Sequence, residues 1–289
     1  MDLLLTAVVQ GLVMGLVYAL VSLGLGLIWG VMDVINFAHA EYTMLAMYAT
    51  YFAVTLLHLD LLAALPLVAA AGFLAGFATY LVLIRRIMDA PAVTQIFATF
   101  GLLFFLRYGA FAVFGPDFRG ITWAPGGGSL SLAGVSVSTA KAAAAVAALL
   151  VFALLHAFLE RTKVGKALQA TAQSPAAALA LGIEVERMYM LAWGLSIATA
   201  AVGGVFLLPF YQVSPTVGDA FLLLMFASVV LGGFGSLLGP LIGGMAIGLV
   251  ESVAGNLISP TFKLAFVFAV FLLVLFVRPS GLLGQEQRG

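Results

Sequence analysis

The sequence lacks cysteine entirely, and only 8% of its 289 residues are charged. Without thiols the chain can form neither a disulfide nor a thiolate metal site. A typical soluble domain has about 25% charged residues, so this scarcity of charge argues against a soluble protein. Lysine and arginine equal aspartate and glutamate in number, 12 of each, and no basic tract stands out, which argues against nucleic acid as a partner.

Hydrophobic residues are abundant instead, at 64% of the chain with a mean hydropathy of +1.19. Apolar runs of about 20 residues, the length of a membrane-crossing helix, recur along it. The sequence therefore predicts an all-α polytopic protein, surrounded by membrane lipid, with one transmembrane domain over residues 1–289. About eight hydrophobic segments are expected, of which at least one is broken by glycine or re-entrant: 7–29, 36–57, 61–84, 95–114, 140–159, 188–211, 220–256 and 261–278.

Two longer loops indicate which side of the membrane each end faces. Residues 160–187 hold four of the 12 basic residues, whereas 115–139 are rich in glycine, proline and serine. Short basic loops stay in the cytoplasm, so 160–187 is predicted inside and 115–139 outside. Arg278 also prefers the cytoplasm, which requires 220–256 to enter and leave on the outer side. A re-entrant hairpin is therefore favoured there over a single crossing, and alternation places the N-terminus outside.

A run of glycines interrupts the segment 220–256. Close helix packing is the favoured interpretation, because small residues let helices approach in lipid. The alternative, which Pro240 supports, is a helix break that exposes backbone groups to a translocation path. Gly232, Gly233 and Gly235 are then candidates for that path. The stretch GGFGSLLG has the glycines of a phosphate-binding loop but no lysine, so the chain is not expected to bind ATP itself.

A second polar stretch, Asp33 to Tyr42, adjoins an apolar segment. Ionisable residues at membrane depth usually face an aqueous cavity or a partner. Asn36, His39 and Glu41 either form a hydrogen-bonded anchor between helices or line the translocation path, and both alternatives stay open. Asn36 and His39 should share a helical face, while Glu41 lies about 200° away, so His39 and Glu41 need not act together. Two ligands without a third predict no metal site.

Two other charged residues lie in apolar surroundings. Arg107 is about two-thirds along its segment, where snorkelling to the outer interface is the favoured interpretation. The alternatives are an ion pair with Glu41 and contact with a substrate carboxylate. Glu251 lies near the break in 220–256 and is expected to face water or a partner subunit.

The stretch AQSPAAALALGIE, residues 172–184, predicts a short capped helix over 175–181. Ser174 suits the N-cap, Pro175 the first helical position, and Gly182 the position after the last turn. The helix is apolar and has no basic face or aromatic anchor for a membrane surface. A groove on another protein is favoured, with packing under its own bundle as the alternative. The residues expected to carry this contact are Ala172, Gln173, Ser174, Pro175, Ala178, Leu181 and Gly182.

Four stretches together resemble the LivH-type permease subunits of branched-chain amino acid ABC importers. They are INFAHAEYTMLAMY (35–48), GKALQATAQSPAAALALGIEVERM (165–188), VLGGFGSLLGPLIGG (230–244) and RPSGLLG (278–284). The resemblance extends over essentially the full length. It implies that 172–182 is a coupling segment seated on an ATP-binding subunit.

The resemblance also implies that the chain depends on partner subunits. By this resemblance the chain has no catalytic residues and binds no cofactor, because two ATP-binding subunits hold ATP and magnesium. The other partners are a second permease subunit, which is a related but different chain, and an extracytoplasmic solute-binding protein. The complex resides in the bacterial inner membrane and imports branched-chain amino acids.

Two positions depart from the family pattern. Ala40 stands where the family has glycine, and Arg107 where it has an uncharged polar residue, so the substrate is left open. Urea, short amides and aromatic acids are alternative substrates for such a permease. A different class is a stand-alone secondary transporter or channel that uses Glu41, His39 or Arg107. An intramembrane enzyme is disfavoured, because the sequence shows no nucleophile and base pair.

Overall fold

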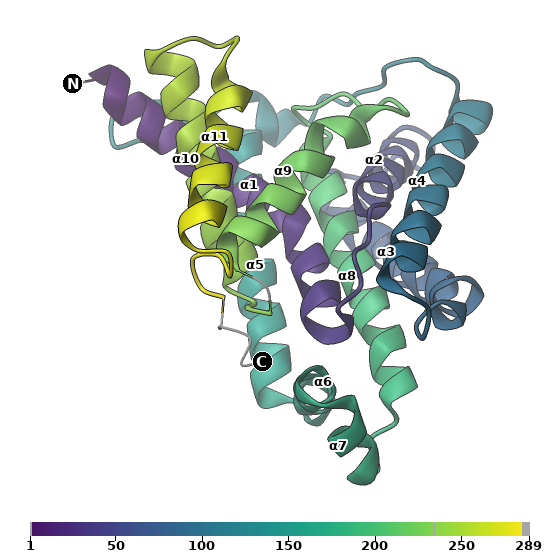
Figure 1. Ribbon diagram of the computed structural model, residues 1–289. Helices are drawn as coiled ribbons and strands as arrows, with labels where there is room; N and C mark the ends of the chain where they lie inside the picture. The colour runs from purple at the N-terminus through teal and green to yellow at the C-terminus, as the bar shows by residue number, and fades with distance from the viewer. Residues whose placement is uncertain (1, 234, 285–289) are drawn as a thin grey trace.

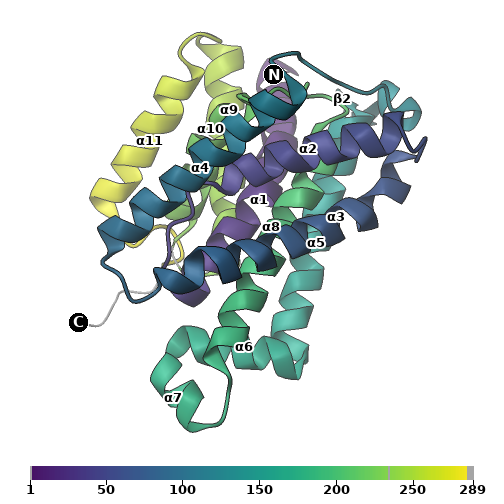
Figure 2. The ribbon, with the colours of Figure 1, turned by 90° about the vertical axis from the view of Figure 1, so that its right-hand side faces the viewer.

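The computed structural model describes residues 2–233 and 235–284, which form a bundle of helices with one small β-hairpin (Figures 1 and 2). This confirms the predicted all-α polytopic class. The elements are α1 (Asp2–Met32), α2 (His39–Thr55), α3 (Leu61–Val82), η1 (Ile84–Arg86), α4 (Ala92–Phe114), η2 (Ala124–Gly127), β1 (Ser129–Leu132), β2 (Val135–Ser138), α5 (Thr139–Arg161), α6 (Lys163–Gln173), α7 (Pro175–Ala180), α8 (Val185–Leu207), α9 (Val217–Gly232), α10 (Gly239–Leu257) and α11 (Lys263–Val277).

Within the described part of the chain, six helical stretches are long and apolar enough to cross a membrane. They are α1, α3 continued through η1, α4, α5, α8 and α10, while α9 and α11 are shorter apolar helices. Helices α1 and α8 are mostly buried at the centre, whereas α3 and α4 are peripheral. Large apolar side chains on the outside, such as Phe105 at 74% and Phe276 at 92% exposed, suit contact with lipid.

The centre of the bundle is held together by a close contact between α1 and α10. A Cβ atom at Gly15 would lie 2.6 Å from the Cα of Met245, and one at Gly244 would lie 2.6 Å from the backbone nitrogen of Ala19. Because lipid gives no hydrophobic drive for helix association, dispersion contacts at such short range supply the attraction. Glycine is needed at both positions for the backbones to approach this far.

Two helix breaks lie within the bundle. Between α1 and α2 the chain is non-helical over 33–38, ending in a turn at residues 37–38, and climbs back beside α1, so that α2 begins partway up the bundle (Figure 1). Between α9 and α10 the helix is interrupted after Gly232, and α10 returns to the end from which α9 came (Figure 1). Each break starts on a residue with positive φ, 54° at Asp33 and 104° at Gly233. The predicted interruption of 220–256 is confirmed, whereas the predicted start of the second segment at residue 36 is three residues too early.

The two long loops lie at opposite ends of the bundle (Figure 2). The loop 115–139 contains η2 and the antiparallel hairpin β1–β2, whose turn residues Ala133 and Gly134 have φ of 51° and 81°. This hairpin end is also where α1 begins (Figure 2). The loop 160–187 contains α6 and α7, which project from the other end, called here the α7 end. The separation agrees with the predicted placement of the two loops on opposite sides of a membrane.

Candidate translocation path and coupling segment

Helix α7 forms at the predicted place and with the predicted caps. The Ser174 side-chain oxygen accepts a hydrogen bond from the backbone of Ala177 at 3.2 Å. At the other end Gly182 has φ of 79°, and the backbone N–H of Ile183 donates to the carbonyl of Ala178 at 3.0 Å. This is the Schellman arrangement, which glycine favours after the last turn. The local sequence therefore determines this helix, although α7 ends one residue earlier than predicted.

The exposed face of α7 differs from the predicted one at one position. Ala178 is only 1% exposed and packs inside the chain, so it is wrong as a contact residue for a partner. Leu179, which was not singled out in the sequence, is 65% exposed, and Leu181 is 79% exposed. A leucine pair on a projecting helix presents the apolar surface that a helix-in-groove contact uses.

Helix α6, which precedes α7, was missed in the sequence. Thr162 caps it by accepting a hydrogen bond from the backbone of Gly165 at 2.9 Å. Leu168 is buried on one face, while Lys166 on the other pairs with Glu160 at 2.5 Å. The signal that was available is this alternation of small or apolar residues with lysines after a threonine cap.

A cavity of about 780 Å³ lies between the coupling segment and the two helix breaks. Ala172 and Pro175 line it from the coupling segment, Asp33 from the first break, and Gly235 from the second. Pro279, beyond α11, lines it as well. The structure thus brings Gly235 together with the predicted coupling residues, and a displacement of α7 would act on both breaks.

The other two glycines of the run are engaged in backbone contacts. The carbonyl of Leu231 accepts a hydrogen bond from Leu282 at 2.8 Å, and that of Gly232 accepts one from Leu283 at 3.0 Å. A Cβ at Gly233 would lie 2.8 Å from the Cα of Gly284. Gly232 and Gly233 therefore fit the packing interpretation, because the backbone of the segment 281–284 packs directly against them.

Arg107 binds two carboxylates and joins three helices. From α4 its guanidinium contacts Glu41 of α2 at 2.5 Å and Asp219 of α9 at 2.6 Å. The Glu41 side chain is fully buried and that of Arg107 is 12% exposed. The favoured interpretation that Arg107 snorkels to the interface is wrong, and the alternative ion pair with Glu41 is correct. The reason is that a fully buried carboxylate needs a charged partner, and Arg107 supplies it.

Asn36 and His39 have partners separate from those of Glu41. His39 Nε2 donates to the carbonyl of Val21 at 3.1 Å, and the Asn36 side-chain oxygen accepts from the backbone of Ala38 at 3.1 Å. Asn36 precedes α2, so the prediction that it shares a helical face with His39 is wrong. The separation of His39 from Glu41 is confirmed.

The beginning of α2 nevertheless contains several buried polar atoms without a hydrogen-bond partner among the described residues. They are Asn36 Nδ2, His39 Nδ1, Glu41 Oε2 and Thr43 Oγ1. Most buried polar groups in proteins are paired, so these four atoms are exceptions within the described residues. Interrupted helices of this kind commonly line the substrate path of transporters.

Asp219 is the member of the charge cluster that the sequence interpretation missed, because the predicted segment began one residue later. It lies in the first turn of α9 and its side chain is 57% exposed. With two carboxylates and one guanidinium, the cluster of Glu41, Arg107 and Asp219 has a net charge of −1. An exposed charge on an apolar bundle indicates a face that meets water or another subunit. A signal for Asp219 was available but was not used: acidic residues are scarce in this chain, 12 in 289, so each one beside an apolar segment is a candidate.

Glu251 is the other charged residue that the sequence places in apolar surroundings. Its carboxylate is 8% exposed and accepts hydrogen bonds from the Tyr18 hydroxyl at 2.5 Å and from Lys263 Nζ at 2.6 Å. Glu251 is therefore held by two side chains of the same chain, while it also lines a cavity that opens to the outside, so the prediction that it faces water or a partner is not contradicted.

Comparison with known proteins places these features in a family. The family model described as "Branched-chain amino acid transport system / permease component" matches residues 7–275. The high-affinity branched-chain amino acid transport system permease protein BraD of Pseudomonas aeruginosa is 30% identical, over 96% of this chain and 95% of BraD. The probable branched-chain amino acid transport permease protein LivH of Methanocaldococcus jannaschii is 31% identical, over 92% of this chain and 88% of LivH. A solved chain from PsaBC of Streptococcus pneumoniae in complex with Fab is 14% identical, covers 94% of this chain and 91% of its own length, and has a TM-score of 0.49.

Proposed function

Because the chain belongs to the family of branched-chain amino acid transport system permease components, we propose that it forms part of the membrane pathway of an ABC importer for branched-chain amino acids. The observation that carries this proposal is that the family match, residues 7–275, spans nearly all the described helices. The chain is a multi-pass membrane protein, and the membrane we propose is the bacterial inner membrane.

Energy for transport is supplied by other subunits in this proposal. Two ATP-binding subunits bind ATP and magnesium, and this chain hydrolyses nothing. The coupling segment, residues 172–182 with helix α7, docks on one of them through Leu179 and Leu181. A second, related permease subunit completes the membrane pathway, and a solute-binding protein delivers the amino acid at the hairpin end.

The coupling segment acts on the path through the cavity at the α7 end. When the ATP-binding subunit moves α7, Ala172 and Pro175 move against Asp33 and Gly235, one in each helix break. The breaks respond more readily than intact helices, because their backbone lacks a continuous hydrogen-bond ladder. The face with Arg107 and Asp219 then borders the solute path or the second permease, where the half-exposed carboxylate stays hydrated.

The docking proposal is tested by changing the exposed leucines of α7. The double substitution Leu179→Glu with Leu181→Glu places two charges on the contact surface, so copurification of the ATP-binding subunit and ATP-driven leucine uptake in proteoliposomes should both be lost. Ala178→Glu is unsuitable, because Ala178 is buried and its substitution would disturb the packing of the chain itself. The matched control for copurification is Leu130→Glu with Leu132→Glu, two leucines that are 49% and 46% exposed at the hairpin end, away from the contact with the ATP-binding subunit.

Two results would contradict the proposal. One is an α7 variant that retains the ATP-binding subunit as well as the control does. The other is leucine accumulation by the purified chain alone in vesicles with an ion gradient. That second result would establish the secondary transporter, which the buried pair of Glu41 and Arg107 also allows.

A further inference from the structure

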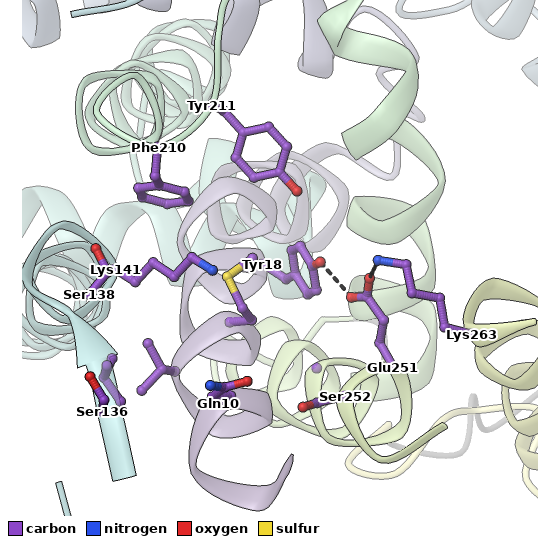
Figure 3. Close-up of a pocket in the computed structure, with 14 residues that line it drawn as sticks. Gln10, Tyr18, Ser136, Ser138, Lys141, Phe210, Tyr211, Glu251, Ser252 and Lys263 are labelled. Carbon is purple, nitrogen blue, oxygen red and sulfur yellow. Dashed lines mark hydrogen bonds and ion pairs between the residues drawn. The ribbon is translucent and has the colours of Figure 1, made fainter. Parts of the chain in front are cut away.

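A second cavity, of about 410 Å³, opens near the hairpin end and has no part in the proposed coupling (Figure 3). Its walls come from α1, β2, the start of α5, the loop before α9, the end of α10 and the start of α11. The volume lies within the range of about 300–1,000 Å³ typical of small-molecule sites. The cavity therefore has room for one amino acid.

The charges in this cavity leave one ammonium group unpaired. The Glu251 carboxylate is bound by Tyr18 and Lys263, as the dashed lines in Figure 3 show. Lys141 lies across the cavity from them, with its Nζ 6.0 Å from the centre of the Phe210 ring. No carboxylate in the described part of the chain pairs with Lys141. An ammonium group aimed into a partly enclosed cavity attracts an anion more strongly than one in open water.

The remaining lining is divided between hydroxyl groups and an apolar wall. Ser136 and Ser138 add hydroxyl groups to the lining on the side of Lys141, and Tyr211 adds one above the centre (Figure 3). Val13 and Met14 of α1 form the apolar wall. A carboxylate joined to a branched aliphatic side chain matches both parts.

The Glu251 carboxylate provides a place for a positive group as well. Each of its oxygens accepts one hydrogen bond, from Tyr18 or from Lys263. A carboxylate offers about four lone-pair sites, so further acceptor capacity is left for an ammonium group. Lys141 of α5 and Glu251 of α10 thus present opposite charges to the same cavity.

We propose that the hairpin-end cavity binds a free aliphatic amino acid, with Lys141 holding its carboxylate, Glu251 its ammonium group and the apolar wall its side chain. The choice of leucine as the amino acid rests on the proposed function. The site lies at the end where a solute-binding protein would release its cargo, so it receives the amino acid before it crosses the membrane.

The test is binding of tritiated leucine to the importer complex in nanodiscs, without ATP and without the solute-binding protein. Wild type should bind leucine at concentrations up to about 1 mM. Lys141→Gln should weaken binding by about tenfold or more, as expected for loss of about 1.4 kcal/mol or more, and Lys141→Arg should keep most of it. Leucinamide, which lacks the carboxylate, should compete far more weakly than leucine.

The matched control is Arg86→Gln. Arg86 is an exposed arginine of η1 that does not line this cavity, so its substitution should leave leucine binding unchanged. Elution profiles and melting temperatures show whether each variant is folded. The proposal is overturned if wild type does not bind leucine, if folded Lys141→Gln binds as well as wild type, or if leucinamide competes as well as leucine.

A lipid phosphate is the other anion that Lys141 would attract, and nanodiscs with and without phosphatidylglycerol distinguish it. Native mass spectrometry that finds this lipid on wild type but not on Lys141→Gln, without leucine binding in either nanodisc, also overturns the proposal. ATP-driven leucine uptake by the complex tests the proposed function separately. Uptake without Lys141-dependent binding refutes this site alone, whereas Lys141-dependent binding without uptake refutes the importer alone.

Discussion

Arg107 connects α4 with α2 and α9 through two carboxylates, and it is the side chain on which the charge balance of this region depends. Glu41 is fully buried, so its carboxylate has no access to water when the guanidinium is absent. Removing one partner of a buried ion pair typically costs about 3–5 kcal/mol, because the other charge is left uncompensated. The pair to Asp219 is worth less, since that side chain is 57% exposed.

Arg107→Gln should therefore destabilise the protein by about 3 kcal/mol or more, seen as a lower melting temperature of the purified protein in detergent. Adding Glu41→Gln removes the orphaned charge and should recover most of the loss, because a neutral pair of amides can hydrogen-bond. Arg86→Gln, at an exposed arginine, serves as the control. If Arg107→Gln and the double variant melt at the same temperature, the buried pair does not hold these helices together.

Residue-level prediction succeeded where the cause is local. The Ser174 cap acts three residues along the chain, within the reach of capping rules. The pair of Arg107 and Asp219 spans 112 residues, and only the folded bundle brings the two together. The sequence offered Glu41 as a partner only as an alternative, because nothing local shows that residues so far apart in the chain meet.

At the scale of elements, the two helix breaks have different supports. The non-helical segment 33–38 is held by side chains: Thr99 donates to the carbonyl of Ile35 at 3.0 Å, and Phe37 stacks on Phe100 with ring centres 4.2 Å apart. The break after α9 is held by backbone, through hydrogen bonds to the segment 281–284. Both devices supply hydrogen-bond partners that a broken helix in a membrane would otherwise lack.

Gly281→Ala tests the second support against a matched glycine. Gly281 and Gly134 both have φ of 81°, so alanine at either carries a similar backbone strain. A Cβ at Gly281 would lie 2.6 Å from the Cα of Gly233, whereas one at Gly134 meets nothing within 4 Å. Gly281→Ala should lower the melting temperature clearly more than Gly134→Ala. Equal shifts would show that the segment 281–284 does not pack against the break as described.

The break after α9 was predictable because glycine and proline announce it in the sequence. The break at 33–38 was predicted only in part: the expected segments left 30–35 between them, but the second was expected to begin at residue 36, whereas α2 begins at His39. Apolar composition reports burial in lipid but does not distinguish helix from extended chain. Helix α6 was missed for another reason: its face is amphipathic, and a search for apolar runs passes over it.

At the scale of the whole molecule, the two cavities and the two long loops divide the chain into ends with different tasks. The hairpin end carries the charged cavity with Lys141, and the α7 end carries the coupling segment and the cavity beside both breaks. This division was predictable from the positions of basic residues, because loop charge reflects the side of the membrane. Neither cavity was predictable, since each is assembled from segments far apart in sequence.

The absence of cysteine makes this division directly testable. Ser131→Cys, on the exposed strand β1, should react with a membrane-impermeant maleimide added to intact cells. Ala176→Cys, on the exposed face of α7, should react only after the membrane is opened. The reversed pattern would invert the orientation of the protein, and labelling of both from outside would contradict a membrane between the two ends.

The contact between residues 281–284 and the end of α9 has a consequence for synthesis. The ribosome makes these residues after every helix described here, so the carbonyls of Leu231 and Gly232 stay without these partners until translation has passed α11. A nascent chain can therefore insert all the described helices into the bilayer before the contact between 281–284 and the end of α9 has formed. A premature stop just after α11 would yield a product in which the carbonyls of Leu231 and Gly232 lack these partners, and proteases can recognise such a locally unfolded region.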